Sequence, residues 1–302
     1  DYINGHAVME EFAITCNFSS DVSLQTPKNA SNNSQFKPDL VIIPNVRAQF
    51  GDFDNPVQSN INIIPELNVL LAKGLTASAQ VIFPVQNDFF FDDEEKEIRS
   101  GNITVNQLLR LEDDFFITFS AGFFTLNRAG INIEFKKYFA ERRVALGADL
   151  GYTGYHSFTG EDPVFYESSN NLTALLDLSY RYQPYDVTAR IRGGYFLYND
   201  LGARFDVLRQ FGEVNIGFFA MISKDSEVNG GFNFAIPIPP RKYTKINPVR
   251  IRPAKKFTWE YRARGFPENG MMHETGHELF DTMLDFQPEF VKKRFLIVLS
   301  KK

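Results

Sequence analysis

The chain has 302 residues, 43% of them hydrophobic, with a formal net charge of −5 and a single cysteine, Cys16. This charge gives no general attraction to nucleic acid, and one cysteine excludes an internal disulfide framework and a four-cysteine metal site. No run approaches the roughly 20 apolar residues that a membrane-spanning helix needs. Aromatic residues are abundant, with 31 Phe and 12 Tyr against one Trp.

Residues 1–39 are expected to hold one strand, Ala7–Cys16, and a polar linker. After residue 39, the alternation of side chains and the turn residues predict twelve strands. Lengths of roughly 9–14 residues suit tilted strands that cross a membrane. The expected spans are 40–50, 58–71, 75–86, 102–111, 114–124, 129–139, 142–155, 171–182, 187–198, 202–210, 213–222 and 228–238.

Apolar and polar side chains alternate within these strands. In 129–139, for example, the two sets are Ile131, Ile133 and Phe135 against Asn132, Glu134 and Lys136. A period of two places the sets on opposite faces of a sheet. One face is apolar and aromatic, whereas the other carries charges that would be costly in a protein core. The pattern favours an all-β fold, a transmembrane antiparallel β-barrel, over a soluble β-sandwich with an aromatic core.

The connections between the expected strands differ in length. The two long loops, 87–101 and 157–170, follow the third and seventh strands, and the connections after even-numbered strands are tight. Long loops at one end and short turns at the other are typical of barrels in the bacterial outer membrane, with the short turns periplasmic. An even number of strands then places both chain termini in the periplasm.

Twelve charged residues are predicted to face the lumen of the barrel. Because both signs of charge are present, these residues can pair across the lumen. Two interpretations stay open: a lumen plugged by salt bridges and by the N-terminal arm, or a narrow polar conduit in which Arg181, Arg190 and Arg192 meet an anionic ligand. The twelve candidates are Arg47, Glu66, Arg110, Glu134, Lys136, Asp149, Asp177, Arg181, Arg190, Arg192, Arg204 and Asp206.

Two regions outside the strands carry charge. The loop Phe89–Glu97 is rich in carboxylates, which are ligands for divalent cations, although a solvated loop is the simpler interpretation. Prolines after residue 236 end the last strand, so the barrel is expected to span 40–238 and a small basic periplasmic extension to span 239–302. Its basic patch can meet anionic lipid, acidic glycan or a partner protein, or can be solvated: Arg241, Lys242, Lys245, Arg250, Arg252, Lys255, Lys256, Arg262 and Arg264.

The extension contains His273-Glu274-Thr275-Gly276-His277, which matches H-E-x-x-H. On a helix, the two histidines bind zinc and the glutamate acts as a general base. Gly276 lies inside the motif and Pro267 lies before it, which disfavours that helix. No metal, cofactor or catalytic site is therefore predicted, with His273 and His277 as the weakest candidates for metal ligands.

The end of the expected barrel and the residues after it carry a more specific sequence pattern than the alternating strands. It reads Asn229-Gly230-Gly231-Phe232-Asn233-Phe234-Ala235-Ile236-Pro237-Ile238-Pro239-Pro240-Arg241-Lys242-Tyr243, and later Phe257-Thr258-Trp259-Glu260-Tyr261-Arg262-Ala263-Arg264-Gly265. This run resembles YjbH-domain proteins, outer-membrane barrels linked to exopolysaccharide production, and the resemblance covers most of 38–265. Pro38-Asp39-Leu40-Val41-Ile42-Ile43-Pro44-Asn45 looks like the start of that family.

The resemblance implies a non-enzymatic outer-membrane protein in polysaccharide export or cell-surface assembly. Longer members of the family look like tandem barrels, so a single barrel is also expected to act as a subunit of a larger complex. The alternative function is an accessory or structural barrel in a protein secretion or gliding-motility complex. The expected partners are outer-membrane lipid, polysaccharide, and other outer-membrane or periplasmic proteins, with no nucleic acid.

Overall fold

The computed structural model describes residues 35–50, 57–88, 96–111, 114–157, 165–224, 228–239, 244–246, 249–263, 270–287 and 290. The expected strand Ala7–Cys16 and residues 89–95 of the acidic loop lie outside these ranges. So do Arg241, Lys242 and Arg264 of the basic patch, together with the side chain of Lys245.

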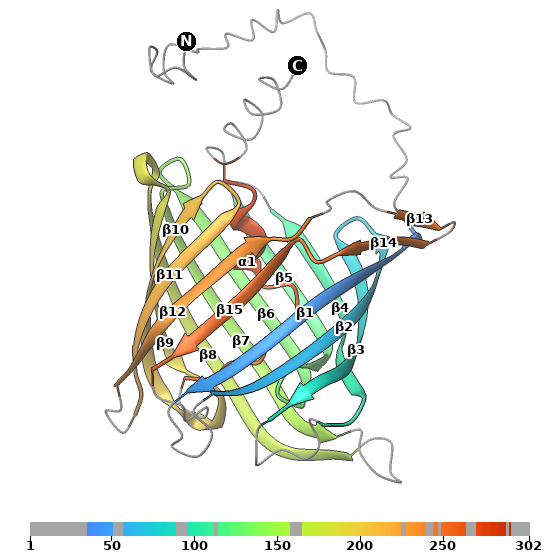
Figure 1. Cartoon of the computed structure of the whole chain (residues 1–302). Helices are drawn as coiled ribbons and strands as arrows, with labels where there is room; N and C mark the ends of the chain where they lie inside the picture. The colour runs from blue at the N-terminus through green and yellow to red at the C-terminus, as the bar shows by residue number, and fades with distance from the viewer. Residues whose placement is uncertain are drawn as a thin grey trace, which may run out of the picture. The chain divides into compact units, whose positions relative to one another are not determined.

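The described residues form strands almost throughout (Figure 1). The twelve predicted strands are confirmed, although β8 begins six residues earlier than expected and β9 ends at Tyr195, before a 3₁₀ turn, Leu197–Asn199. The strands are β1 Pro38–Phe50, β2 Val57–Ala72, β3 Leu75–Asn87, β4 Arg99–Arg110, β5 Phe115–Phe124, β6 Arg128–Phe139, β7 Val144–Ser157, β8 Phe165–Tyr182, β9 Val187–Tyr195, β10 Leu201–Phe211, β11 Val214–Ile222 and β12 Val228–Pro237, followed by β13 Thr244–Ile246, β14 Val249–Pro253 and β15 Lys256–Arg262.

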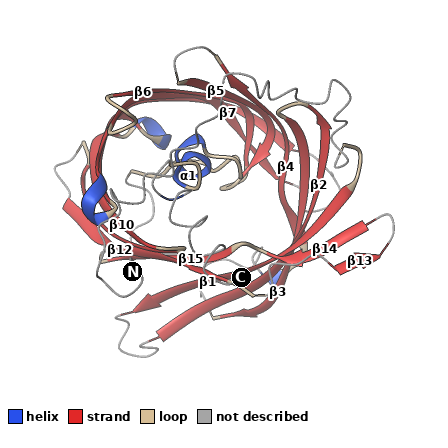
Figure 2. Ribbon diagram, turned by 90° about the horizontal axis from the view of Figure 1, so that it is seen from above, coloured by secondary structure: helices blue, strands red, loops and turns tan. Residues whose placement is uncertain are grey.

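All these strands belong to one 15-stranded sheet with the order β13-β14-β1-β2 and so on through β12 to β15. Neighbours from β1 to β12 are antiparallel, as hairpin connections require, whereas β14 pairs with β1 in parallel. The sheet curls round until β15 lies beside β1 (Figures 1 and 2). Among the described residues no ladder joins these two strands, so the sheet is not closed by hydrogen bonds.

The sheet extends past the boundary expected at residue 238. Strand β14 pairs with β1 and β15 pairs with β12, so both belong to the sheet and not to a separate extension. Apolar and polar residues alternate again along β15, as in the other strands. They also alternate in β14, but that run is short and lies between Pro248 and Pro253.

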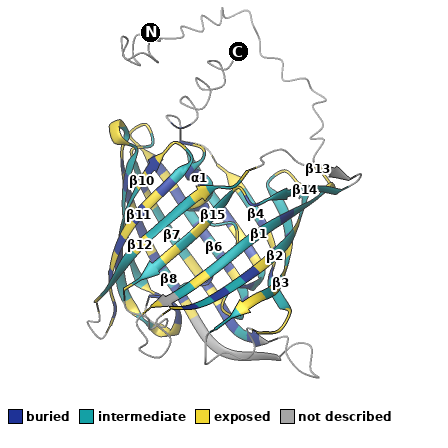
Figure 3. Cartoon of the chain, viewed as in Figure 1, coloured by how far each residue is buried: buried dark blue, intermediate teal, exposed yellow. Residues whose placement is uncertain are grey.

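The two faces of the sheet differ in composition, and exposed and buried residues alternate along the strands in Figure 3. The outer face carries exposed apolar side chains such as Leu176, which is 72% exposed, and Phe218. The inner face carries buried polar side chains such as Asn60, Thr173 and Arg204. A soluble protein buries apolar side chains and exposes polar ones, so this sheet is inverted relative to a soluble core.

The turns at one end of the sheet are tight, as predicted. Gly74 ends the turn between β2 and β3 with φ 75°, and a Cβ at this position would lie 2.2 Å from the carbonyl oxygen of Leu108. Only glycine fits that conformation at that distance. Within the described residues no helix is both long and apolar enough to cross a membrane. One short helix, α1 Leu279–Leu284, follows the strands.

Candidate functional site: the inner face and the C-terminal segment

Residues 270–287, here called the C-terminal segment, lie against the inner face, and α1 is surrounded by strands in Figure 2. Backbone hydrogen bonds hold the segment along its length. The amide of Leu197 donates to the carbonyl of Met271 at 3.0 Å, and the amide of Glu274 donates to Oγ1 of Thr125 at 2.7 Å. Because these bonds use backbone groups of the segment, they depend weakly on its side chains. Sequence patterns therefore gave no signal for them.

Helix α1 anchors the segment through apolar contacts. Leu279, which is 1% exposed, and Met283 pack with Phe116, Tyr138 and Ala145 on the inner face. This small cluster lies among polar residues. It could not be predicted from the sequence, because Phe116 and Tyr138 occupy positions where the alternation predicts polar side chains. A fully buried leucine contributes about 1.5–3 kcal/mol, so the cluster favours a docked segment.

The amide of Leu279 also donates to Oε2 of Glu134 at 3.0 Å. The adjacent Phe280 ring contacts two cations, 4.7 Å from Nζ of Lys136 and 4.0 Å from Cζ of Arg190. Cation–π contacts of this kind stabilise by about 0.5–2 kcal/mol each. Three of the predicted lumen-facing residues thus hold the C-terminal segment and do not line an empty conduit.

The strand register places all twelve predicted lumen-facing residues on the inner face. Those of β6 to β10 form a charge network. Lys136 Nζ lies 2.7 Å from Asp177 Oδ1, and Arg190 binds the other oxygen of Asp177. Arg204 binds Asp206 at 2.8 Å and reaches Glu260 of β15 at 2.8 Å, so the network extends to the edge strand.

The three arginines considered for an anionic ligand each pair with a carboxylate of the chain. Arg181 binds Asp186 at 3.1 Å, Arg190 binds Asp177, and Arg192 lies 3.5 Å from Asp206. Each arginine thus contacts a carboxylate of the chain, although Asp177 is shared with Lys136 and Asp206 with Arg204. Of the other candidates, Arg110 pairs with Asp114, Glu66 accepts hydrogen bonds from Asn68 and Gln80, Asp149 lies opposite Glu134, and Arg47 is exposed on β1.

Replacing Asp177 with alanine is expected to destabilise the folded state by about 3–5 kcal/mol, because two buried cations, Lys136 and Arg190, lose their carboxylate. Denaturant titration of the refolded protein in lipid vesicles measures this. Glu141→Ala is the matched control, since the Glu141 side chain is 82% exposed and its pair with Arg143 is worth at most about 1 kcal/mol. Equal stabilities of the two variants would show that the network does not support the fold.

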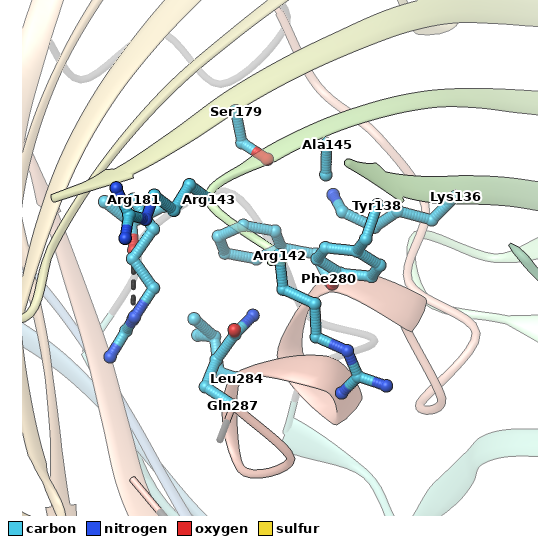
Figure 4. Close-up of a pocket in the computed structure, with 11 residues that line it drawn as sticks. Lys136, Tyr138, Arg142, Arg143, Ala145, Ser179, Arg181, Phe280, Leu284 and Gln287 are labelled. Carbon is cyan, nitrogen blue, oxygen red and sulfur yellow. Dashed lines mark hydrogen bonds between the residues drawn. The ribbon is translucent and has the colours of Figure 1, made fainter. Parts of the chain in front are cut away.

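A small cavity of about 10 Å³, room for a single water molecule, lies between α1 and the strands (Figure 4). Its lining includes four cationic side chains, Lys136, Arg142, Arg143 and Arg181, and Phe280 and Leu284 of the segment. Each of the four cations pairs with a carboxylate that does not line the cavity. The cavity is therefore a gap within a satisfied network and too small for a sugar.

Arg142 links the C-terminal segment to two turns of the sheet. Its Nε and Nη2 donate to the two carboxylate oxygens of Asp114 at 3.0 and 2.7 Å, and its Nη1 donates to the carbonyl of Phe286 at 3.1 Å. These hydrogen bonds from Arg142 lower the pKa of Asp114. The bidentate pair fixes the guanidinium so that its third donor meets the segment.

The H-E-x-x-H residues do not form a zinc site. His273 to His277 precede α1 and are not helical, so the two histidines do not share a helix face. The His273 ring is buried, stacks on Phe124 at 5.1 Å and lies 3.2 Å from Oδ1 of Asn132. The described residues include no group of three His, Cys, Asp or Glu side chains that could hold a metal ion. His273 therefore anchors the segment.

Acidification is expected to weaken docking of the segment through His273. Burial lowers the pKa of His273 from 6.5 to about 4, so an undocked segment binds a proton between these values that the docked segment excludes. Stability contributed by neutral His273 is thus present above pH 6.5 and lost towards pH 4, by roughly 3 kcal/mol. Hydrogen exchange of 270–287 is measured as a function of pH in the native protein and in His273→Gln. All other groups titrate in both proteins, so the difference between them gives the contribution of His273.

The described members of the basic patch are distributed over the sheet edge and are largely paired. Arg250 binds Asp39 of β1, Lys256 lies 3.1 Å from Asp285 of the C-terminal segment, and Arg262 lies 3.0 Å from Glu260. The pairs of Arg250 and Lys256 join β14 to β1 and β15 to the C-terminal segment, whereas the pair of Arg262 lies within β15. These three side chains are therefore engaged by carboxylates of the chain.

The family model described as exopolysaccharide biosynthesis protein YbjH matches residues 6–283. The chain belongs to the YjbH family. This confirms the resemblance expected from 38–265, and the YjbH match extends into α1, so the docked segment is part of the family unit. No curated protein and no solved structure matches the chain.

Proposed function

We propose that this chain is a non-enzymatic β-barrel of the bacterial outer membrane that takes part in exopolysaccharide export or assembly at the cell surface. Membership in the YjbH family supports the link to exopolysaccharide. The inverted sheet supports the membrane: exposed apolar side chains cover the outer face from β2 to β12, whereas soluble monomers rarely expose contiguous apolar patches above a few hundred Å².

The strands and turns fit the same proposal. Strands β1 to β12 are 9 to 18 residues long, enough for a tilted crossing of the hydrocarbon layer. The turns after β2, β4, β6, β8 and β10 are short, and the loop after β3 is long, which is the asymmetry of outer-membrane barrels. The described residues at each end of the chain, Gln35 beside Leu70 and Phe286 beside Arg142, lie near the short turns, and we assign this side to the periplasm.

The docked C-terminal segment supports a component of an assembly over an open pore. Helix α1 lies inside the curled sheet and packs on its inner face, which reduces the space there for a polysaccharide. The chain thus acts together with other outer-membrane or periplasmic proteins, or opens when they bind. The same observation favours the second candidate, an accessory barrel subunit of a secretion or gliding-motility complex.

Deletion of the gene in the source organism tests the proposal. Loss of surface polysaccharide, restored by the native chain, is expected, whereas secreted proteins and motility remain normal. Unchanged polysaccharide with a defect in secretion or motility would favour the second candidate. Gentle extraction followed by mass spectrometry of copurifying proteins gives an independent answer, since the two functions predict different partners.

A further inference from the structure

The wall of the curled sheet contains a fork. Strands β14 and β15 are separated by two residues and run in the same direction, yet β14 pairs with β1 whereas β15 pairs with β12. Two hydrogen bonds mark the fork: the amide of Ala254 donates to the carbonyl of Ile42 at 2.8 Å, and the amide of Ile238 donates to the carbonyl of Lys255 at 3.1 Å. Beyond it, residues 44–50 of β1 and 256–262 of β15 border a seam.

The two borders of the seam are in register. In the ladder of β1 and β14, Asp39 pairs with Arg250, and the separation of 211 residues continues unchanged to Phe50 and Tyr261. The rings of Phe50 and Tyr261 are indeed in contact, with centroids 5.8 Å apart. A parallel ladder of β1 and β15 would thus form without any shift of either strand.

Pro44 lies where the ladder stops. Since the Ile42 carbonyl accepts from Ala254, the backbone groups of even-numbered residues in β1 point to this side. The next bond of a parallel ladder would run from the amide of residue 44 to the carbonyl of Ala254. Proline has no amide hydrogen, so the donor for that bond is missing. Sequence alone gave no reason to single out this proline, because β1 was expected to be an ordinary strand.

We propose that the seam between β1 and β15 is a lateral gate in the wall, open here, which closes through an in-register parallel ladder and is kept easy to open by Pro44. The gate rests on the proposed membrane location. In hydrocarbon each unpaired backbone group costs several kcal/mol, which favours closure, and the missing bond at Pro44 reduces that preference. Opening joins the polar inner face, with Arg47 and Glu260, to the lipid-facing side, with Phe50 and Tyr261.

Two cysteines placed across the seam report closure. We would combine Arg47→Cys with Thr258→Cys, which face each other in the proposed ladder, on a Cys16→Ser background, in the full chain reconstituted in phospholipid nanodiscs. Adjacent strands bring Cα atoms within the range of a disulfide, so oxidation captures the closed state. Arg47→Cys with Lys256→Cys, two residues out of register, is the control and should stay reduced.

Pro44→Ala, which supplies the missing donor, is the decisive variant. One added hydrogen bond should speed disulfide formation and slow hydrogen exchange at Val46, Ala48 and Phe50 by about fivefold each. Pro84→Ala in β3, away from the seam, should change neither. The gate is overturned if Pro44→Ala has no effect, if both cysteine pairs form equally, or if native seam amides exchange as slowly as those in the centre of β6.

Failure of the membrane proposal gives a different result. A chain that does not enter nanodiscs would disprove the outer-membrane location, whereas the cysteine pairs and Pro44→Ala can still be compared in detergent micelles. If the in-register cysteine pair forms in micelles and Pro44→Ala speeds its formation, the seam closes as proposed, and only the role of the gate in a membrane is disproved.

Discussion

Replacing Leu176 with arginine is expected to lower the free energy of unfolding in a lipid bilayer by about 2–4 kcal/mol, the cost of a charged side chain on the lipid-facing side near the midplane. Leu176 lies on the outer face of β8 and is 72% exposed. In a soluble protein the same change at so exposed a position would stay within about 0.5 kcal/mol. Urea titration of the protein refolded into vesicles therefore distinguishes lipid from water at this site.

Glu141→Arg serves as the control for Leu176→Arg. Glu141 lies in the turn between β6 and β7 and its side chain is 82% exposed, so an arginine there contacts water under either interpretation. A large effect at Leu176 together with a small effect at Glu141 supports a lipid-facing outer surface. Small effects at both positions would mean that the apolar outer face is covered by something other than lipid.

Replacing Leu279 with aspartate is expected to release the C-terminal segment from the inner face. The change removes the main apolar anchor of α1 and places a carboxylate beside Glu134, at a cost of about 3–5 kcal/mol. Hydrogen exchange over 270–287 should become fast while that of β6 and β7 stays slow. In planar bilayers the released protein should conduct ions, whereas the native protein should not.

The matched variant is Phe286→Asp, which introduces the same charge into the same segment. Phe286 is 59% exposed, and its carbonyl, which accepts from Arg142, belongs to the backbone. Docking and conductance should therefore match those of the native protein. Slow hydrogen exchange over 270–287 in Leu279→Asp would contradict the role of Leu279 as the anchor of the segment. Fast exchange without ion conductance would show that another part of the chain blocks the lumen.

The strands could be predicted from the sequence because alternation with a period of two is a local property. Ile131, Asn132 and Ile133 already reveal two faces, and Gly74 and Gly212 reveal turns. The pairing of β14 with β1 could not be predicted, since it joins residues 211 positions apart in a segment interrupted by Pro253. Local periodicity carries no information about such a long-range parallel contact.

The charged residues of the inner face could also be predicted, but the C-terminal segment that lies against them could not. The positions of Glu134, Lys136 and Arg190 followed from strand parity, whereas the docked segment depends on backbone hydrogen bonds and on one buried leucine. The H-E-x-x-H pattern drew attention to the same stretch for a different reason. His273 is important there because it is buried against Phe124, which a motif based on metal ligands does not describe.

Fractionation of native membranes tests the membrane barrel most directly. The chain should be recovered in the outer-membrane fraction, resist extraction by carbonate, and migrate faster in SDS without boiling than after boiling, because a folded barrel resists detergent until heated. Recovery in the soluble fraction, or migration that does not change on heating, would contradict a membrane-spanning sheet and would leave the apolar outer face as the surface of a protein complex.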